Sequence, residues 1–322
     1  MLKKIDFSQI EGLSAGNAQD DKAKTGVTVF VFPETAIAAC DVSGGGPASR
    51  EVPVVDVEKN DVPVNAIILA GGSAFGLAAA DGVMKCLEEH SMGYDTHFAK
   101  VPIVVQSDIY DLSYGSSDVR PDSDMGYKAC SNALNKNSPV SGNVGGGCGA
   151  TAGKIGGMKR AQKSGIGYAA CSLGNLKVGA AVVVNSFGDV FSKGKKICGL
   201  MNEERSGYCD FMEEFYQAAQ SRYSEKYKNT NTTIGAVFTN GNFTKSDLKK
   251  IAVMARAAYG KCIVPCGTMG DGDTIYAASC GPKTEADVNL AGLMAVEAME
   301  SAIADAVESS RISDEEYLAN IK

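Results

Sequence analysis

Runs of apolar and β-branched residues mark the strands of this chain. Residues 26–32 and 37–42 alternate between two faces and predict a hairpin-like start. Residues 66–70 and 178–184 are apolar on both faces, which is typical of strands buried on both sides. Further strands are predicted at 101–110, 233–239, 262–264 and 275–279.

Helical segments alternate with these strands. Ala78 to Glu89 predicts a helix whose N-cap is Ser73, and Thr244 with Asp247 predicts the capped start of a helix that Gly260 closes. Helices are also predicted at Glu213 to Lys228 and from Thr284 to about Ser309, the latter with an Ala-rich face suited to packing on a sheet.

Composition and charge narrow the class of protein. The 322 residues are 44% hydrophobic and 21% charged, which fits a globular protein of one large domain or two. A net charge of −7, without a run of five basic residues, argues against a nucleic-acid partner. The N-terminus lacks the apolar core of a signal peptide and no apolar run approaches 18 residues, so we expect a cytoplasmic protein without a membrane partner.

Cysteine and histidine restrict the chemistry. The ten Cys are scattered without a CxxC pair and are expected to be free buried thiols. Only two His are present, so a zinc site is poorly supplied and we expect no metal. A Ser-His or Cys-His hydrolase would have to use His90 or His97, and the elbow motif around Ser73 has Phe75 where Gly is required.

A glycine-dense segment covers residues 142–154. It does not match a phosphate-binding P-loop, because Cys148 stands where Gly is needed and Ile155 where Ser or Thr is needed, so we expect no nucleotide cofactor. Bare backbone at Gly147 and Gly149 would instead let a substrate approach closely, with Lys154 at the rim of its pocket. The alternative is that Lys154 is a surface lysine.

The bond between Asn231 and Thr232 lies where a polar segment meets a strand. One interpretation is a self-cleaving precursor, in which the Thr232 hydroxyl attacks the Asn231 carbonyl and a new N-terminal Thr is released. The freed α-amine, with a reference pKa of roughly 7.7–8.0, would then serve as the base for its own hydroxyl. The other interpretation is a Thr-rich strand entry without chemistry.

Three further places carry polar groups near predicted strand ends. Asn185 ends a strand and is either a turn former or an amide donor to an oxyanion. Asp271 and Asp273 flank a glycine; they are too few for a calcium loop and would suit the amine and hydroxyl of a nucleophile. Tyr110 is either a core tyrosine or part of a site.

Seven of these segments, in order, resemble the L-aminopeptidase/D-esterase family, also called DmpA-like or P1-family peptidases, which includes nylon hydrolase. The matching motifs are T-G-V-T-V at 25–29, I-L-A-G-G-S-A-F-G-L-A-A-A-D-G-V at 68–83, V-P-I-V at 101–104, G-N-V-G-x-G-x-G-A-T-A-G-K at 142–154, V-V-V-N-S-F-G-D-V at 182–190, N-T-T-I-G at 231–235 and D-G-D-T at 271–274. The resemblance covers nearly the whole chain except residues 192–230.

The resemblance implies a four-layer α-β-β-α sandwich, like Ntn-hydrolases in architecture but with its own connectivity. It also implies one domain, residues 1–322, self-cleaved into an α subunit of residues 1–231 and a β subunit of residues 232–322. By motif, Thr232 is the nucleophile and Asn185 the oxyanion donor. Lys154, Asp271 and Asp273 match residues of the nylon-hydrolase branch, whereas peptidase members have Ser and Glu in place of the two Asp. Tyr110 falls where peptidase members carry an active-site Tyr.

Two functional hypotheses follow. The first is a self-processing N-terminal-threonine amidohydrolase that acts on peptides or amide oligomers, or as an aminopeptidase or esterase on short L-, D- or β-peptides, and forms a homo-oligomer such as a tetramer of αβ units. The second is a non-catalytic binding or assembly protein with the same fold.

Overall fold

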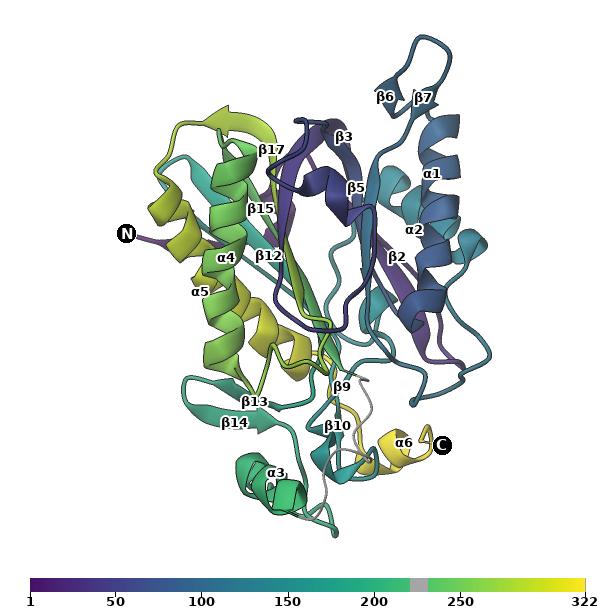
Figure 1. Cartoon of the computed structure of the whole chain (residues 1–322), viewed down its shortest axis with the longest axis vertical. Helices are drawn as coiled ribbons and strands as arrows, with labels where there is room; N and C mark the ends of the chain where they lie inside the picture. The colour runs from purple at the N-terminus through teal and green to yellow at the C-terminus, as the bar shows by residue number, and fades with distance from the viewer. Residues whose placement is uncertain (221–230, 322) are drawn as a thin grey trace.

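The computed structural model describes residues 1–220 and 231–321, and they form four layers. Two β-sheets lie face to face, with α4 and α5 covering the outside of one and α1 and α2 the outside of the other (Figure 1). This is the α-β-β-α sandwich expected from the sequence, and that prediction is confirmed.

Ten strands form one hydrogen-bonded network in the order β1-β11-β12-β15-β17-β3-β5-β8-β4, with β2 also paired to β3. Their bounds are β1 Lys3–Ile5, β2 Ser14–Asp20, β3 Thr25–Val42, β4 Ala48–Arg50, β5 Val64–Ala70, β8 Val104–Asp108, β11 Ile166–Leu173, β12 Leu176–Asn185, β15 Thr232–Gly241 and β17 Thr274–Thr284. Smaller sheets are made by β6 Tyr94–Asp95 with β7 Lys100–Val101, by β9 Thr151–Ala152 with β10 Gln162–Lys163, and by β14 Lys195–Cys198, β13 Asp189–Ser192 and β16 Ile263–Val264.

Strand β3 folds this network into two layers. Its first half pairs with β2 and β5, and its second half pairs with β17, with an irregular register between Val31 and Ala36. The hairpin predicted at 26–42 is therefore wrong. Pro33 lacks an N–H and Thr35 adopts φ 65°, so the strand is irregular there. The chain does not turn back on itself as in a hairpin; it continues as one strand to Val42.

The helices are α1 Ala79–Glu89, α2 Ser123–Asn135, α3 Phe211–Gln220, α4 Lys245–Cys262, α5 Val288–Glu308 and α6 Asp314–Leu318. The capping box of Thr244 and Asp247 is present, but α4 runs past Gly260 to Cys262. Ser73 is not an N-cap: Gly72 and Ser73 turn with positive φ into a 3-10 helix, Ser73–Ala78, which precedes α1. The part of the predicted helix at 221–228 lies outside the described residues.

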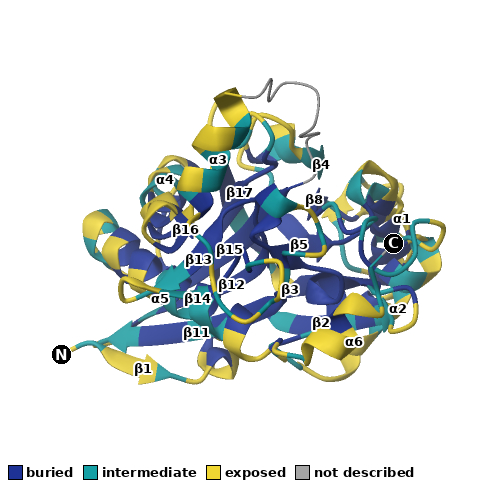
Figure 2. Ribbon diagram, turned by 90° about the horizontal axis from the view of Figure 1, so that it is seen from below, coloured by how far each residue is buried: buried dark blue, intermediate teal, exposed yellow. Residues whose placement is uncertain are grey.

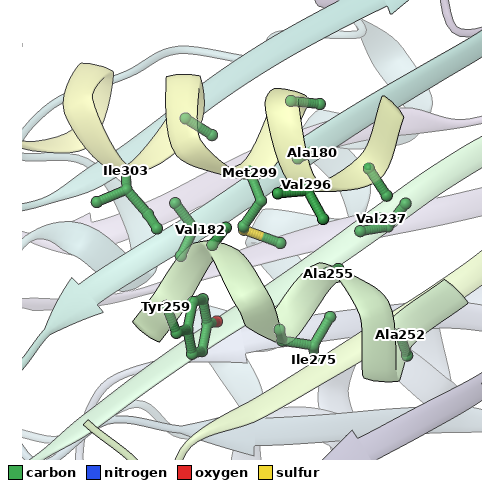
Figure 3. Close-up of a cluster of buried hydrophobic side chains, with 14 of the residues drawn as sticks. Ala180, Val182, Val237, Ala252, Ala255, Tyr259, Ile275, Val296, Met299 and Ile303 are labelled. Atoms are coloured by element: carbon green, nitrogen blue, oxygen red, sulfur yellow. The ribbon is translucent and has the colours of Figure 1, made fainter. Parts of the chain in front are cut away.

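Three hydrophobic cores separate the four layers. Along β12, Val182 and Val184 face α4 and α5, whereas Ala181 and Val183 face the second sheet, as the two-residue period of a strand requires. Met299 and Ile303 of α5 lie over Val182 (Figure 3). Between the sheets, Phe30 of β3 meets Phe238 of β15 with ring centroids 4.9 Å apart.

Buried residues concentrate in the strands, while the outer faces of the helices are exposed (Figure 2). All ten cysteines are free thiols and eight are buried, as predicted. In the part of the chain that the structure describes, no helix combines the length and hydropathy needed to span a bilayer.

Candidate active site

The ends of three neighbouring strands meet at one edge of the first sheet. Asn185, the last residue of β12, pairs with Thr232, the first residue of β15. Strand β17 runs parallel to β15, and Asn231 bridges to Asp271 just before both strands begin. Because β12 is antiparallel to β15, its carboxyl end meets the amino ends of the other two. The topology therefore gathers Asn185, Thr232 and the acidic turn into one row.

The acidic turn is held by backbone groups. The Asp273 carboxylate accepts hydrogen bonds from the N–H groups of Thr233 at 2.6 Å and Gly267 at 2.8 Å. Asp271 accepts from the N–H of Thr268 at 2.8 Å and from its hydroxyl at 2.6 Å. These bonds fix both side chains, and the one from Thr233 ties Asp273 directly to the residue after Thr232.

The loop that follows β3 also forms hydrogen bonds to this turn. The N–H groups of Ser43 and Gly44 bond to the Asp273 carbonyl at 2.9 and 3.1 Å, and that of Gly46 bonds to the Asp271 carbonyl at 2.9 Å. A Cβ on Gly44 would lie 2.3 Å from the Asp271 carbonyl oxygen, so only glycine permits this approach.

The Asn231 carbonyl oxygen is contacted from two sides. It accepts a hydrogen bond from the Gly272 N–H at 3.0 Å, and the Thr232 hydroxyl also donates to it. Thr232 is only 5% exposed, and the side-chain oxygen of Asn231 is buried without a hydrogen-bond partner among the described residues. The peptide bond before Thr232 is thus enclosed and polarised.

The Asn185 side chain is locked in one orientation. Its Oδ1 accepts from the Lys154 ammonium at 2.7 Å and from the Thr151 N–H at 3.1 Å. Its Nδ2 donates to the Tyr110 carbonyl at 2.9 Å, which uses one of its two N–H bonds. The second has no acceptor among the residues that the structure describes, so it can serve another group. Lys154 also donates to the Asn185 carbonyl at 3.0 Å.

Burial shifts the charges of this cluster toward neutrality. It lowers the pKa of Lys154 to about 7, against the attraction of Asp271 and Asp111. It raises the pKa of Asp273 to about 7, with the Asp271 charge adding to the rise, and it raises the pKa of Asp271 despite the bonds from Thr268. Lys154 is 9% exposed, so it is not a surface lysine, and its place at the rim of a substrate pocket stays a prediction.

Asp111 is a member of this cluster that the sequence did not single out. It accepts from the Thr25 hydroxyl and the Gly72 N–H, both at 2.7 Å, and burial raises its pKa to about 6 while Lys154 opposes that rise. Its only sequence signal is its position beside Tyr110 just past a strand, which many turn aspartates share.

The other predicted binding residues have different surroundings. Tyr110 is half-buried and reaches Asn185 through its backbone carbonyl. Gly147 and Gly149 are buried: a Cβ on Gly147 would lie 2.2 Å from the Ile166 nitrogen, and one on Gly149 would lie 2.3 Å from the Lys24 carbonyl oxygen. Close packing against neighbouring backbone is therefore enough to require glycine at both positions, and their contact with substrate stays a prediction.

Ser73 and His90 do not form a serine-histidine site. Ser73 precedes α1 and His90 follows it, and the 11 residues of α1 span about 16 Å between them. In the described ranges, no group of three or more His, Cys, Asp or Glu side chains is arranged to hold a metal ion.

Comparisons with known proteins identify the family of this chain. A family model described as peptidase family S58 matches residues 6–313. An uncharacterized aminopeptidase of Mycobacterium leprae is 36% identical over 271 residues, which cover 80% of this chain and 71% of that protein. The 6-aminohexanoate-oligomer endohydrolase of Kocuria sp. is 32% identical over 267 residues, covering 83% and 72%.

Solved structures agree on the fold. The L-aminopeptidase D-Ala-esterase/amidase of Ochrobactrum anthropi, described as a variant of the Ntn-hydrolase fold, superposes with a TM-score of 0.70 over 98% of this chain and 94% of that one. A Burkholderia sp. β-aminopeptidase gives 0.68 over 99% and 94%. At 16% identity each, these two show the fold alone. The family match over residues 6–313 shows more: the chain belongs to peptidase family S58 and is a hydrolase of amide bonds.

Proposed function

We propose that this chain is a precursor that cuts itself between Asn231 and Thr232, and that the freed Thr232 then hydrolyses amide bonds of peptides or amide oligomers. The two products are an α subunit of residues 1–231 and a β subunit of residues 232–322. The observation that carries the proposal is the contact of the Thr232 hydroxyl and the Gly272 N–H with the one carbonyl that such a cut requires.

The self-cleavage proceeds in two balanced steps. The Thr232 oxygen bonds to the Asn231 carbonyl carbon, the hydroxyl proton passes to the Thr232 nitrogen, and the C–N bond breaks to give an ester and a free amine. Water then adds to the ester carbon and the C–O bond breaks, which leaves a carboxyl on Asn231 and restores the hydroxyl. The Gly272 N–H, 3.0 Å from the carbonyl oxygen, stabilises the negative charge that develops there.

In the mature enzyme, the Thr232 amine takes the proton of its own hydroxyl during attack on the substrate carbonyl. Asn185 pairs with Thr232 across the sheet and has one unused amide N–H, so it is the proposed oxyanion donor. Lys154 holds that amide in place, and Asp271 and Asp273 stabilise the new ammonium and orient it. The acyl group leaves Thr232 when water attacks the ester.

The relatives frame the substrate class. One is named for endohydrolysis of 6-aminohexanoate oligomers and others are named aminopeptidases. The Asp271 and Asp273 pair favours amide oligomers over terminal residues of short peptides, on the branch resemblance noted above. A homo-oligomer of αβ units in the cytoplasm is the assembly we propose for the mature enzyme.

Intact-mass analysis of purified protein tests this function. We expect two fragments, with the N-terminal sequence of the small one starting at Thr232, and turnover of aminohexanoate oligomers or peptide p-nitroanilides. Thr232→Ala should leave one intact, inactive chain, whereas Thr232→Ser, which keeps a hydroxyl, should still cut. An uncut wild-type chain with full amidase activity would refute the proposal, and an uncut chain without activity would favour the binding-protein hypothesis.

A further inference from the structure

A cavity lies outside the catalytic row. It has a volume of about 240 Å³ and is bounded by β10, β14, the loop around Arg205, the end of α5 and the start of α6. None of the residues proposed for catalysis lines it.

Positive charge converges on this cavity. Lys163, Arg205 and Arg311 line it, and Asp314 is the one acidic residue among its lining residues. Burial lowers the pKa of Lys163 to about 7, so the excess near neutral pH lies between one and two positive charges, in a chain whose own net charge is −7. Such a local excess attracts an anion.

The three cations are not equivalent. The Lys163 side chain donates its hydrogen bonds to backbone carbonyls, those of Gly147 at 3.2 Å, Ala150 at 3.0 Å and Ser164. Arg205 is occupied by Asp314 and by the carbonyls of the 159–161 segment. Both contribute charge but few free donors.

Arg311 is the cation whose donors remain for a ligand. It is exposed and makes no hydrogen bond or ion pair to any described residue. Burial raises the pKa of Cys198, a lining residue, to about 12, and the charges of Arg311 and Arg205 oppose that rise.

Apolar side chains form part of the remaining wall. Ile197, Val307 and Ile312 line the cavity together with the rings of Tyr208 and Tyr317. A planar guanidinium binds a carboxylate through two parallel hydrogen bonds, and aliphatic walls favour a ligand with a hydrocarbon part. We propose that this cavity is a binding site for a small organic carboxylate, with Arg311 holding the carboxylate and the aliphatic side chains of the wall contacting its short hydrocarbon part.

Lys163 connects the cavity to the catalytic row through hydrogen bonds. Lys163 lines the cavity and binds the carbonyls of Gly147 and Ala150, and the next residue, Thr151, donates to Asn185. Binding at Arg311 does not require an active nucleophile, so the inference stands independently of the proposed function.

Isothermal titration of full-length Thr232→Ala protein with butyrate tests the site, with butyramide as the neutral isostere and inorganic phosphate as the competing anion. We expect a Kd on the order of 1 mM for butyrate, because a ligand of six non-hydrogen atoms can provide the binding free energy that this value requires. Butyramide should bind at least tenfold more weakly. Arg311→Gln should weaken butyrate binding at least tenfold. Lys195→Gln removes the same charge from an exposed position on β14 that does not line the cavity, and should leave binding unchanged.

Each other outcome overturns the assignment. Butyrate binding that survives Arg311→Gln, or that is lost equally in Lys195→Gln, would show that the cavity is not the site. Phosphate binding more tightly than butyrate with the same dependence on Arg311 would overturn the carboxylate class. Arg311→Lys, which keeps the charge, should retain part of the affinity, and thermal unfolding of each variant separates lost binding from lost fold.

Discussion

A methyl group placed on Gly272 would meet the side chain of Thr232. The added Cβ would lie 2.8 Å from the hydroxyl oxygen, 3.1 Å from the Thr232 methyl carbon and 3.0 Å from the Gly46 carbonyl oxygen. Ordinary contact begins at 3.4 Å, so the hydroxyl must retreat by about 0.6 Å. Gly272 does not have positive φ, so alanine there is opposed by this contact and not by its backbone conformation.

The expected effect is on the rate of self-cleavage. A displacement of 1 Å at a reacting atom costs about a hundredfold in rate, so a retreat of about 0.6 Å predicts a slowing of Gly272→Ala on the order of tenfold to a hundredfold. The assay is the fraction of uncut chain, followed by intact mass at intervals after rapid purification.

Gly260→Ala is the matched control. Gly260 lies in α4, is exposed, and an added Cβ there would meet no atom within 4 Å, so this variant should cleave at the wild-type rate and be slightly more stable. Cleavage of Gly272→Ala as fast as Gly260→Ala would refute the placement of the attacking hydroxyl against Gly272.

Three further predictions concern the surrounding residues. Asn185→Ala should lower the turnover number of the mature enzyme by about a hundredfold to a thousandfold, as loss of an oxyanion donor does, and an unchanged value in steady-state kinetics would contradict that role. Lys154→Met removes a cation that stabilises the charged forms of Asp271 and Asp111, so their pKa values should rise and the acid limb of the pH–rate profile should move to higher pH; an unmoved limb would count against the coupling. Because the folded-state pKa of Asp273 is raised to about 7 from 3.8, the folded chain holds more protons than the unfolded chain between those values, and stability falls as pH rises through them. Urea unfolding of uncut Thr232→Ala protein should show this loss between pH 4.5 and 7.5, and adding Asp273→Asn should flatten it; parallel curves would contradict the assignment.

Most strands and helices could be predicted from short stretches of sequence, because the apolar pattern and the capping residues of those stretches match their burial and their ends in the structure. The two-sided apolar run at 178–184 became the central strand β12, and Thr244 capped α4 as its sequence requires. The bend in β3 was missed because 26–32 and 37–42 pair with different sheets, and that choice depends on partners distant in the sequence.

The candidate site followed from motif order and not from pattern. Asn185, Thr232 and Asp271 are separated by more than thirty residues at each step, and only the pairing of β12, β15 and β17 brings them together. Asp111 escaped notice because its significance comes from burial beside Lys154, which no local signal encodes. The burial of Lys154 was likewise not evident, since a lysine after a glycine-rich segment is more often exposed.

The balance of charge among the buried acids and Lys154 changes when the chain cuts itself, on the proposed mechanism. Three buried carboxyl groups, those of Asp111, Asp271 and Asp273, have raised pKa values, and the Lys154 cation opposes the rise at Asp111 and at Asp271. Self-cleavage would add a second cation, the Thr232 ammonium, next to Asp273, whose carboxylate already bonds to the following residue. The new charge would lower the pKa of Asp273 and, by the same coupling, raise that of the amine. The pKa of about 7 is thus a property of the uncut chain, and on the proposed mechanism cutting converts an unfavourable cluster of acids into a paired one.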